Sequence, residues 1–157
     1  MRETATAAKM DHYTVGDNDT RPWGYYEVIG VGVDENGEGY CEKEIRVDPG
    51  HILSLQSHNH RRELWTVKKG ILEVVLNDRH ITLQAGESIN IPLKAIHCMA
   101  NGADEPCIVH ERQIGMCSED DIIRYIDAYG RGTLDNADDN IQKSVDVYNR
   151  IKTDIQK

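Results

Sequence analysis

The sequence predicts an all-β barrel followed by a helical C-terminal extension. Short runs rich in β-branched and aromatic residues fill the stretch from Tyr25 to Gln113, and turn residues such as Asp34–Gly37 and Asp48–Gly50 separate them. No helical pattern interrupts these runs, so βαβ units are not expected. Many short strands at close spacing are typical of a β-sandwich or a jelly-roll barrel.

The expected strands follow one another along the chain, at 25–33, 39–47, 51–57, 63–68, 71–76, 79–83, 88–91 and 107–113. After Cys117 the pattern changes to helical spacing. Ser118 is a suitable N-cap for a helix that ends near Gly130. A second amphipathic stretch carries Ile141, Val145, Tyr148, Ile151 and Ile155. We therefore expect a flexible arm at 1–20, the barrel at 21–117 and a helical segment at 118–157.

Composition limits the partners of this 157-residue chain. Its 18 basic and 27 acidic residues give a net charge of −9, so nucleic acid is not expected as a partner. No apolar run approaches the roughly 20 residues that cross a bilayer, and residues 1–20 lack an apolar signal core. We therefore expect a cytoplasmic protein without a membrane partner.

The first stretch that indicates chemistry is GHILSLQSHNHRRELWTVKKG, from Gly50 to Gly70. Residues two apart on a strand point the same way, so Gln56 and His58 share one face. A turn after His58 brings Glu63, on the next strand, alongside them. If this face lines the barrel, the three side chains project into one cavity.

The second stretch is GESINIPLKAIHCMAN, from Gly86 to Asn101, and it contributes His97. Two imidazoles, one carboxylate and one amide oxygen form a mixed nitrogen and oxygen set that suits a divalent transition metal. We predict a metal site made of Gln56, His58, Glu63 and His97. The expected ion is zinc, with manganese, cobalt, nickel and iron as alternatives.

These two stretches resemble the paired motifs of the cupins, Gly-x5-His-x-His-x3–4-Glu-x6-Gly and Gly-x5-Pro-x-Gly-x2-His-x3-Asn. Gln56 stands in place of the leading His, and Lys94 stands in place of the inner Gly. The resemblance implies the cupin double-stranded β-helix, a jelly-roll barrel. His58 and His60 also form a His-x-His pair, but only two residues then separate His60 from Glu63. Two residues are too few for the cupin turn, so Gln56 and His58 are preferred as the pair. His60 is kept as an alternative ligand in place of Gln56.

Residues 21–131 also resemble the C-terminal cupin of the type II mannose-6-phosphate isomerases. The segments that carry this resemblance are RPWGYYEV, LSLQSHNHRRELWTV and SEDDIIRYIDAYGR. It implies a metal-dependent isomerase that interconverts mannose 6-phosphate and fructose 6-phosphate. The candidate catalytic residues are His60, Glu44 and Lys94, and the candidates for binding the substrate phosphate are Arg112 and Arg131.

Two other functions fit the same residues. One is a sugar-binding or regulatory cupin without catalysis, and the other is an iron-dependent cupin oxygenase. The expected partners are a phosphorylated sugar and a second copy of the chain in a homodimer.

Overall fold

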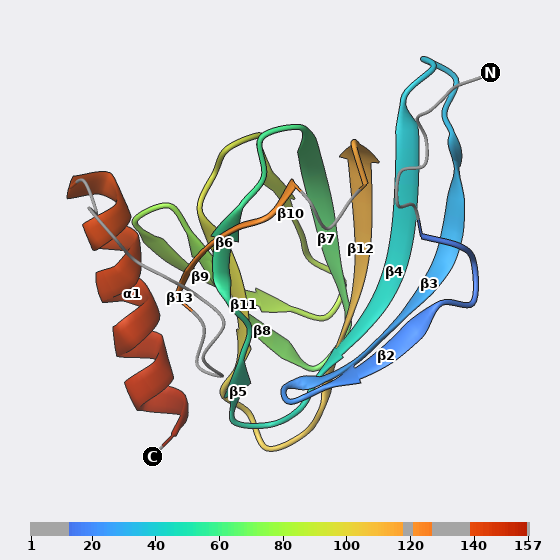
Figure 1. The fold of residues 1–157 in the computed structure, drawn as a ribbon. Coiled ribbons are helices and arrows are strands. Elements are labelled where there is room, and N and C mark those ends of the chain that lie inside the picture. The colour runs from blue at the N-terminus through green and yellow to red at the C-terminus, as the bar shows by residue number, and fades with distance from the viewer. Residues whose placement is uncertain (1–12, 118–120, 127–138, 157) are drawn as a thin grey trace.

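The computed structural model describes residues 13–117, 121–126 and 139–156. Its strands form two antiparallel sheets that face each other as a jelly-roll barrel, with one helix on the outside (Figure 1). The first sheet has the order β10-β7-β12-β4-β3-β2, and the main path of the second is β13-β6-β11-β8-β9, with β5 paired to β11. The predicted all-β barrel with a C-terminal helix is confirmed.

The elements follow the sequence prediction from β3 to β12, except that the expected strand 51–57 is divided into β5 and β6 and that β11 lies outside the expected strand runs. Their bounds are β2 Asn18–Arg21, β3 Gly24–Val33, β4 Gly39–Val47, β5 His51–Ile52, β6 Leu55–Ser57, β7 Arg61–Lys69, β8 Ile71–Leu76, β9 Arg79–Gln84, β10 Ser88–Ile91, β11 His97–Asn101, β12 Cys107–Gly115, β13 Ile123–Ile126 and α1 Asp139–Ile155.

Alternation along the strands builds the core between the sheets. On β7, Trp65 and Val67 are buried while Thr66 between them is not, and β4 repeats the pattern at Ile45 and Val47. These inward side chains pack against Leu72 and others from the second sheet. Because alternate residues face opposite ways, each strand of the first sheet presents one face to the barrel interior and one to solvent.

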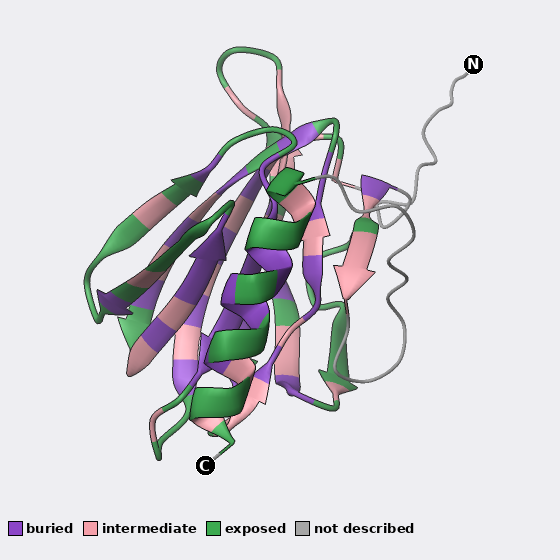
Figure 2. Ribbon diagram, turned by 90° about the vertical axis from the view of Figure 1, so that its left-hand side faces the viewer, coloured by how far each residue is buried: buried purple, intermediate pink, exposed green. Residues whose placement is uncertain are grey.

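The helix α1 covers the outer face of the second sheet. Val145, Tyr148 and Ile151 are buried against a cluster that includes Leu55 and Val75, and Figure 2 shows buried residues along one side of the helix and exposed ones along the other. The helix predicted from the spacing of apolar residues at 141–155 is thus present. Within the described residues, no helix has the length and apolarity needed to span a membrane.

Two expected boundaries differ from the structure. Residues 18–20, assigned to a flexible arm, pair with β3 as part of the edge strand β2. Residues 123–126, assigned to a first C-terminal helix, form the strand β13, which pairs with β6. The isoleucines there are compatible with a strand as well as with a helix. Backbone hydrogen bonding to the open edge of β6 favours the strand. Residues 118–120 and 127–130 of that expected helix lie outside the described residues.

Candidate metal centre and adjoining cavity

Three predicted metal ligands meet inside the barrel. His58 follows β6, Glu63 lies on β7 and His97 begins β11, and one ligand atom from each lies within 4.8 Å of the others. All three are buried, with exposed fractions of 2%, 3% and 1%. The Nε2 atom of His58 lies 3.3 Å from Glu63 Oε2, and that of His97 lies 3.9 Å from Glu63 Oε1.

The backbone orients both imidazoles toward this centre. His58 Nδ1 lies 3.0 Å from the carbonyl oxygen of Asp121, and His97 Nδ1 lies 2.9 Å from that of Ala95. A carbonyl only accepts, so Nδ1 carries the proton in each ring and the Nε2 lone pair points inward. Burial lowers the pKa of His58 to about 4 and also lowers the pKa of His97, which keeps both rings neutral.

His97 Nε2 is buried and has no hydrogen-bond partner among the residues that the structure describes. A buried polar atom without a partner is costly, and a metal ion is one partner that would satisfy this lone pair. Two neutral imidazoles beside one ionised carboxylate therefore fit a divalent transition metal.

Glu63 is ionised at the centre of a buried network. Its Oε1 accepts a hydrogen bond of 2.8 Å from Trp65 Nε1, and its Oε2 accepts one of 2.9 Å from Arg61 Nε. Burial acts to raise the pKa of Glu63, but the guanidinium of Arg61 and the two imidazoles hold it well below its usual range. Burial and the charge of Glu63 raise the pKa of Glu111 to about 8, so Glu111 is mostly protonated at neutral pH.

Gln56, the fourth predicted ligand, lies opposite His97 in the pairing of β6 and β11. It is half-buried and lines the adjoining cavity, where its Oε1 accepts a hydrogen bond of 3.1 Å from the Ser54 hydroxyl. Its role as a ligand stays a prediction.

A small cavity of about 90 Å³ opens beside this centre, between the two sheets. Trp23, Tyr26 and Leu53 contribute aromatic and apolar surface. Among the described residues, four cationic side chains line it, against the single carboxyl group of Glu111; these cations are Arg21, Lys43, Arg61 and Arg124. Asp19 pairs with Arg21 at 3.2 Å and Glu63 pairs with Arg61 at 2.9 Å, so these two charges are partly compensated. Because Glu111 is mostly protonated, the lining still carries an excess of positive charge in a chain whose net charge is −9.

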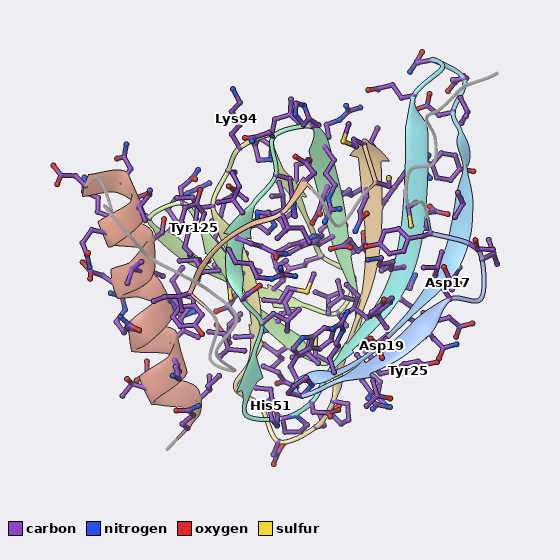
Figure 3. All side chains as sticks on the ribbon, in the orientation of Figure 1. Asp17, Asp19, Tyr25, His51, Lys94 and Tyr125 are labelled. Carbon is purple, nitrogen blue, oxygen red and sulfur yellow. The ribbon has the colours of Figure 1, made fainter. Side chains whose placement is uncertain are left out.

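Two predicted catalytic residues lie at the mouth of the barrel, outside the cavity lining. His60 is exposed in the turn between β6 and β7. Lys94 is exposed on the turn before β11, and its side chain points away from the barrel (Figure 3). Its backbone has φ of 68°, the left-handed region that glycine adopts most readily, which accounts for the glycine of the cupin motif at this position. The Lys94 N–H donates to the His58 carbonyl at 2.7 Å.

The other predicted polar residues are not brought to the centre. Glu44 and Arg112 lie on the outer face of the first sheet, because Lys43, Ile45, Glu111 and Gln113 take the inner face of the same strands. Arg112 instead donates to Glu42 at 2.7 Å. The structure therefore does not bring Glu44 and Arg112 to the metal ligands or to the cavity lining, and their roles as a catalytic and a phosphate-binding residue stay predictions. Arg131 lies outside the described residues.

Sequence reasoning missed several polar residues of the cavity, above all Lys43 and Arg61. The signal was present in the alternation of the strands: Arg61 precedes Glu63 by two residues, and Lys43 precedes Ile45 by two. Charged residues are almost never fully buried unless paired, so residue type alone argues against an inward position for either side chain. Asp121 was also missed. Its carboxylate accepts from the N–H groups of Asn59 and His60, at 3.1 and 2.9 Å, and fixes the turn after His58.

Comparison with known proteins gives the chain a family context. Residues 8–127 match the family model described as Mannose-6-phosphate isomerase C-terminal. The mannose-1-phosphate guanylyltransferase ManC of Salmonella typhimurium is 42% identical over 112 residues, which are 71% of this chain and 22% of that protein. The alginate biosynthesis protein AlgA of Pseudomonas fluorescens is 40% identical over 114 residues, 72% of this chain and 23% of that protein. The chain thus spans less than a quarter of these relatives.

Solved structures agree on the fold. An RmlC-like cupin from Shewanella frigidimarina superposes with a TM-score of 0.55 at 18% identity, over 70% of this chain and 95% of that one. The oxalate decarboxylase of Bacillus subtilis, a protein with Mn(II) centres, superposes with a TM-score of 0.51 at 20% identity, over 59% of this chain and 26% of that one. At these identities the likeness shows the cupin fold alone.

The relatives overturn the expected activity. Their names describe guanylyl transfer and polysaccharide biosynthesis, including xanthan biosynthesis protein XanB of Xanthomonas campestris, and not the interconversion of mannose and fructose phosphates. The interpretation of this chain as an aldose–ketose isomerase is therefore wrong. The relation to mannose metabolism remains.

Proposed function

The chain belongs to the Mannose-6-phosphate isomerase C-terminal family, and from this premise we propose that its barrel binds a phosphorylated mannose derivative beside a divalent metal ion. The observation that carries the proposal is the cationic cavity next to the His58, Glu63 and His97 cluster, with Arg61 common to both. The names of the guanylyltransferase relatives support mannose 1-phosphate as the first ligand to test.

The phosphate of the ligand is assigned to the cations of the cavity. Lys43 is held between two aromatic rings, with its Nζ 3.9 Å from the ring centre of Tyr13 and 4.7 Å from that of Tyr26. Arg21 and Arg124 line the same cavity. Arginine matches the geometry of phosphate oxygens through its planar fork. The small volume suits the phosphoryl group, and Trp23, Tyr26 and Leu53 of the lining offer the sugar an aromatic and apolar surface.

The metal is assigned to His58, Glu63 and His97, with Gln56 as the fourth predicted ligand. When bound, a divalent ion supplies a Lewis-acidic point that coordinates sugar oxygens. Zinc is the first expectation, and the His and carboxylate donors also suit manganese, cobalt, nickel and iron.

The test is calorimetric titration of chelator-treated and metal-reconstituted protein with mannose 1-phosphate, mannose and inorganic phosphate. We expect the sugar phosphate to bind more tightly than either fragment, and more tightly with metal present than without. Equal affinity for mannose and mannose 1-phosphate, or no binding of any of the three, would contradict the proposal.

We also propose a homodimer. Within the described part of the chain, the β2 strand pairs with Gly24–Glu27 of β3, and beyond it the hairpin formed by β3 and β4 extends past the barrel (Figure 1). Ile29, Val31 and Val33 are exposed there, with exposed fractions of 46%, 42% and 69%. Exposed apolar strand surface of this kind favours pairing with another chain. Sedimentation of the wild type and of Val31→Glu tests this, and an unchanged monomeric mass in both would exclude a dimer.

A further inference from the structure

Arg61 occupies an unusual position for a charged residue. It opens β7, two residues before Glu63, and only 3% of it is exposed. Its Nε donates to Glu63 Oε2 at 2.9 Å, and its Nη2 lies 3.1 Å from His58 Nε2. One guanidinium therefore bridges two of the three side chains that form the candidate metal cluster.

The bond to His58 and a bond from His58 to a metal exclude each other. Because His58 Nδ1 faces the Asp121 carbonyl, Nε2 holds the one in-plane lone pair of the ring, and that lone pair accepts from Arg61. The same lone pair is what a metal requires. A guanidinium and a divalent cation also repel each other at this range inside a barrel. A metal at His58 must therefore move Arg61.

The structure offers a position for the displaced side chain. Arg61 already lines the cationic cavity together with Lys43, Arg21 and Arg124. Released from His58, its guanidinium still reaches this cavity, where it adds donors for a phosphate group.

We propose that Arg61 is an internal competitor of the metal, and that its displacement couples metal binding to the binding of a phosphate-bearing ligand. The metal releases the guanidinium, and the guanidinium then binds the ligand phosphate. Linkage requires the coupling to be reciprocal, so the ligand tightens metal binding by the same factor by which the metal tightens ligand binding. The coupling rests on the proposed function, whereas the competition between Arg61 and the metal does not.

The first experiment measures metal affinity without ligand, by titrating chelator-treated protein with Co²⁺ and following its visible absorption. Arg61→Gln should bind Co²⁺ about tenfold more tightly than the wild type, because one charge-assisted hydrogen bond no longer has to be broken. The matched control is Arg62→Gln: Arg62 is the next residue, but it pairs with exposed Glu38 at 3.1 Å on the outer face, and its variant should match the wild type. Weaker Co²⁺ binding by Arg61→Gln would overturn the proposal, because Arg61 would then support the metal ligands.

A second variant keeps the test valid if Arg61→Gln does not fold. Arg61→Lys retains the charge but has no fork that spans Glu63 and His58, so it should also bind Co²⁺ more tightly than the wild type, by a smaller factor. Affinity equal to or below that of the wild type in a folded Arg61→Lys would again overturn the competition.

The second experiment repeats the Co²⁺ titration with saturating mannose 1-phosphate. The wild type and Arg62→Gln should gain about tenfold in Co²⁺ affinity, and Arg61→Gln should gain distinctly less, because only the direct contact between the ion and the sugar remains. An equal gain in Arg61→Gln would refute the coupling through Arg61. Failure of every protein to bind mannose 1-phosphate would instead reject the proposed ligand and the coupling, while the result of the first experiment would still decide the competition.

Discussion

On β7, Arg61 and Arg62 are neighbours in the chain and lie in opposite settings. Arg61 faces the barrel interior and pairs with Glu63, whereas Arg62 faces solvent and pairs with Glu38. The pattern continues on β12, where Glu111 is buried and Arg112 is half-exposed. The same residue types therefore form buried ion pairs on one face of the sheet and solvent-exposed ion pairs on the other. Burial makes the inner charges interact strongly and bind selectively, while water screens the outer ones.

The largest expected difference between the two faces is in the free energy of unfolding that is lost when an ion pair is broken. In metal-free protein, Glu63→Gln should lower the free energy of unfolding by about 3–5 kcal/mol, because it leaves the buried guanidinium of Arg61 uncompensated. Glu42→Gln, which breaks the outer pair with Arg112, should cost no more than about 1 kcal/mol. Urea unfolding in the presence of a chelator measures both. A similar loss in the free energy of unfolding for the two variants would show that the inner ion pair is no stronger than the outer one.

A second prediction concerns the ligand. Lys43→Met should weaken binding of mannose 1-phosphate by about 10-fold to 100-fold, because it removes a charge-assisted hydrogen bond in a buried cavity. Arg112→Gln changes a cation on the outer face and should leave the affinity unchanged. Calorimetric titration of both variants with metal present checks this. A loss in Arg112→Gln comparable to that in Lys43→Met would place the ligand on the outer face.

A third prediction extends the comparison to the turn that joins β6 to β7. Asp121→Ala removes the acceptor for the N–H groups of Asn59 and His60, so it should lower the free energy of unfolding by about 1–3 kcal/mol. Loosening the turn should also weaken Co²⁺ binding by about tenfold, as expected when a group that supports a metal ligand is lost. His60→Ala keeps the backbone N–H and should retain the metal. Loss of metal in His60→Ala would instead favour His60 as a ligand.

The smallest expected effect is at Lys94. Because its φ of 68° is unfavourable for a residue with a side chain, Lys94→Gly should raise the free energy of unfolding by about 0.5–1 kcal/mol. Metal and ligand affinities should stay the same, since the Lys94 side chain points away from the cavity. Thermal unfolding measures the first effect and titration the second. A drop in ligand affinity would restore the predicted role of the Lys94 side chain.

The contrast between the faces also explains what the sequence could predict. Strand limits, the helix at 139–155 and the meeting of His58, Glu63 and His97 follow from local alternation and spacing. Which of His110 and Glu111 faces the cavity does not, because alternation leaves two registers open and the shift of the β7–β12 pairing between Ile108 and Val109 depends on a distant strand. The prediction of a helix at β13 was wrong for the same reason, because pairing with the edge of β6 outweighs the local helix signals of residues 118–126.

The hydrogen bond between His58 and Asp121 joins residues 63 positions apart, and β13 pairs with β6 over a similar separation. Contacts between such distant segments carry a high cost in loop-closure entropy, so they tend to form late in folding. During synthesis, His58, Glu63 and His97 all leave the ribosome before Asp121. A nascent chain would therefore hold every candidate ligand before the segment that orients His58 arrives. We expect tight metal loading to follow the closure of this last strand, so that the order of synthesis delays the capture of an ion until the barrel is complete.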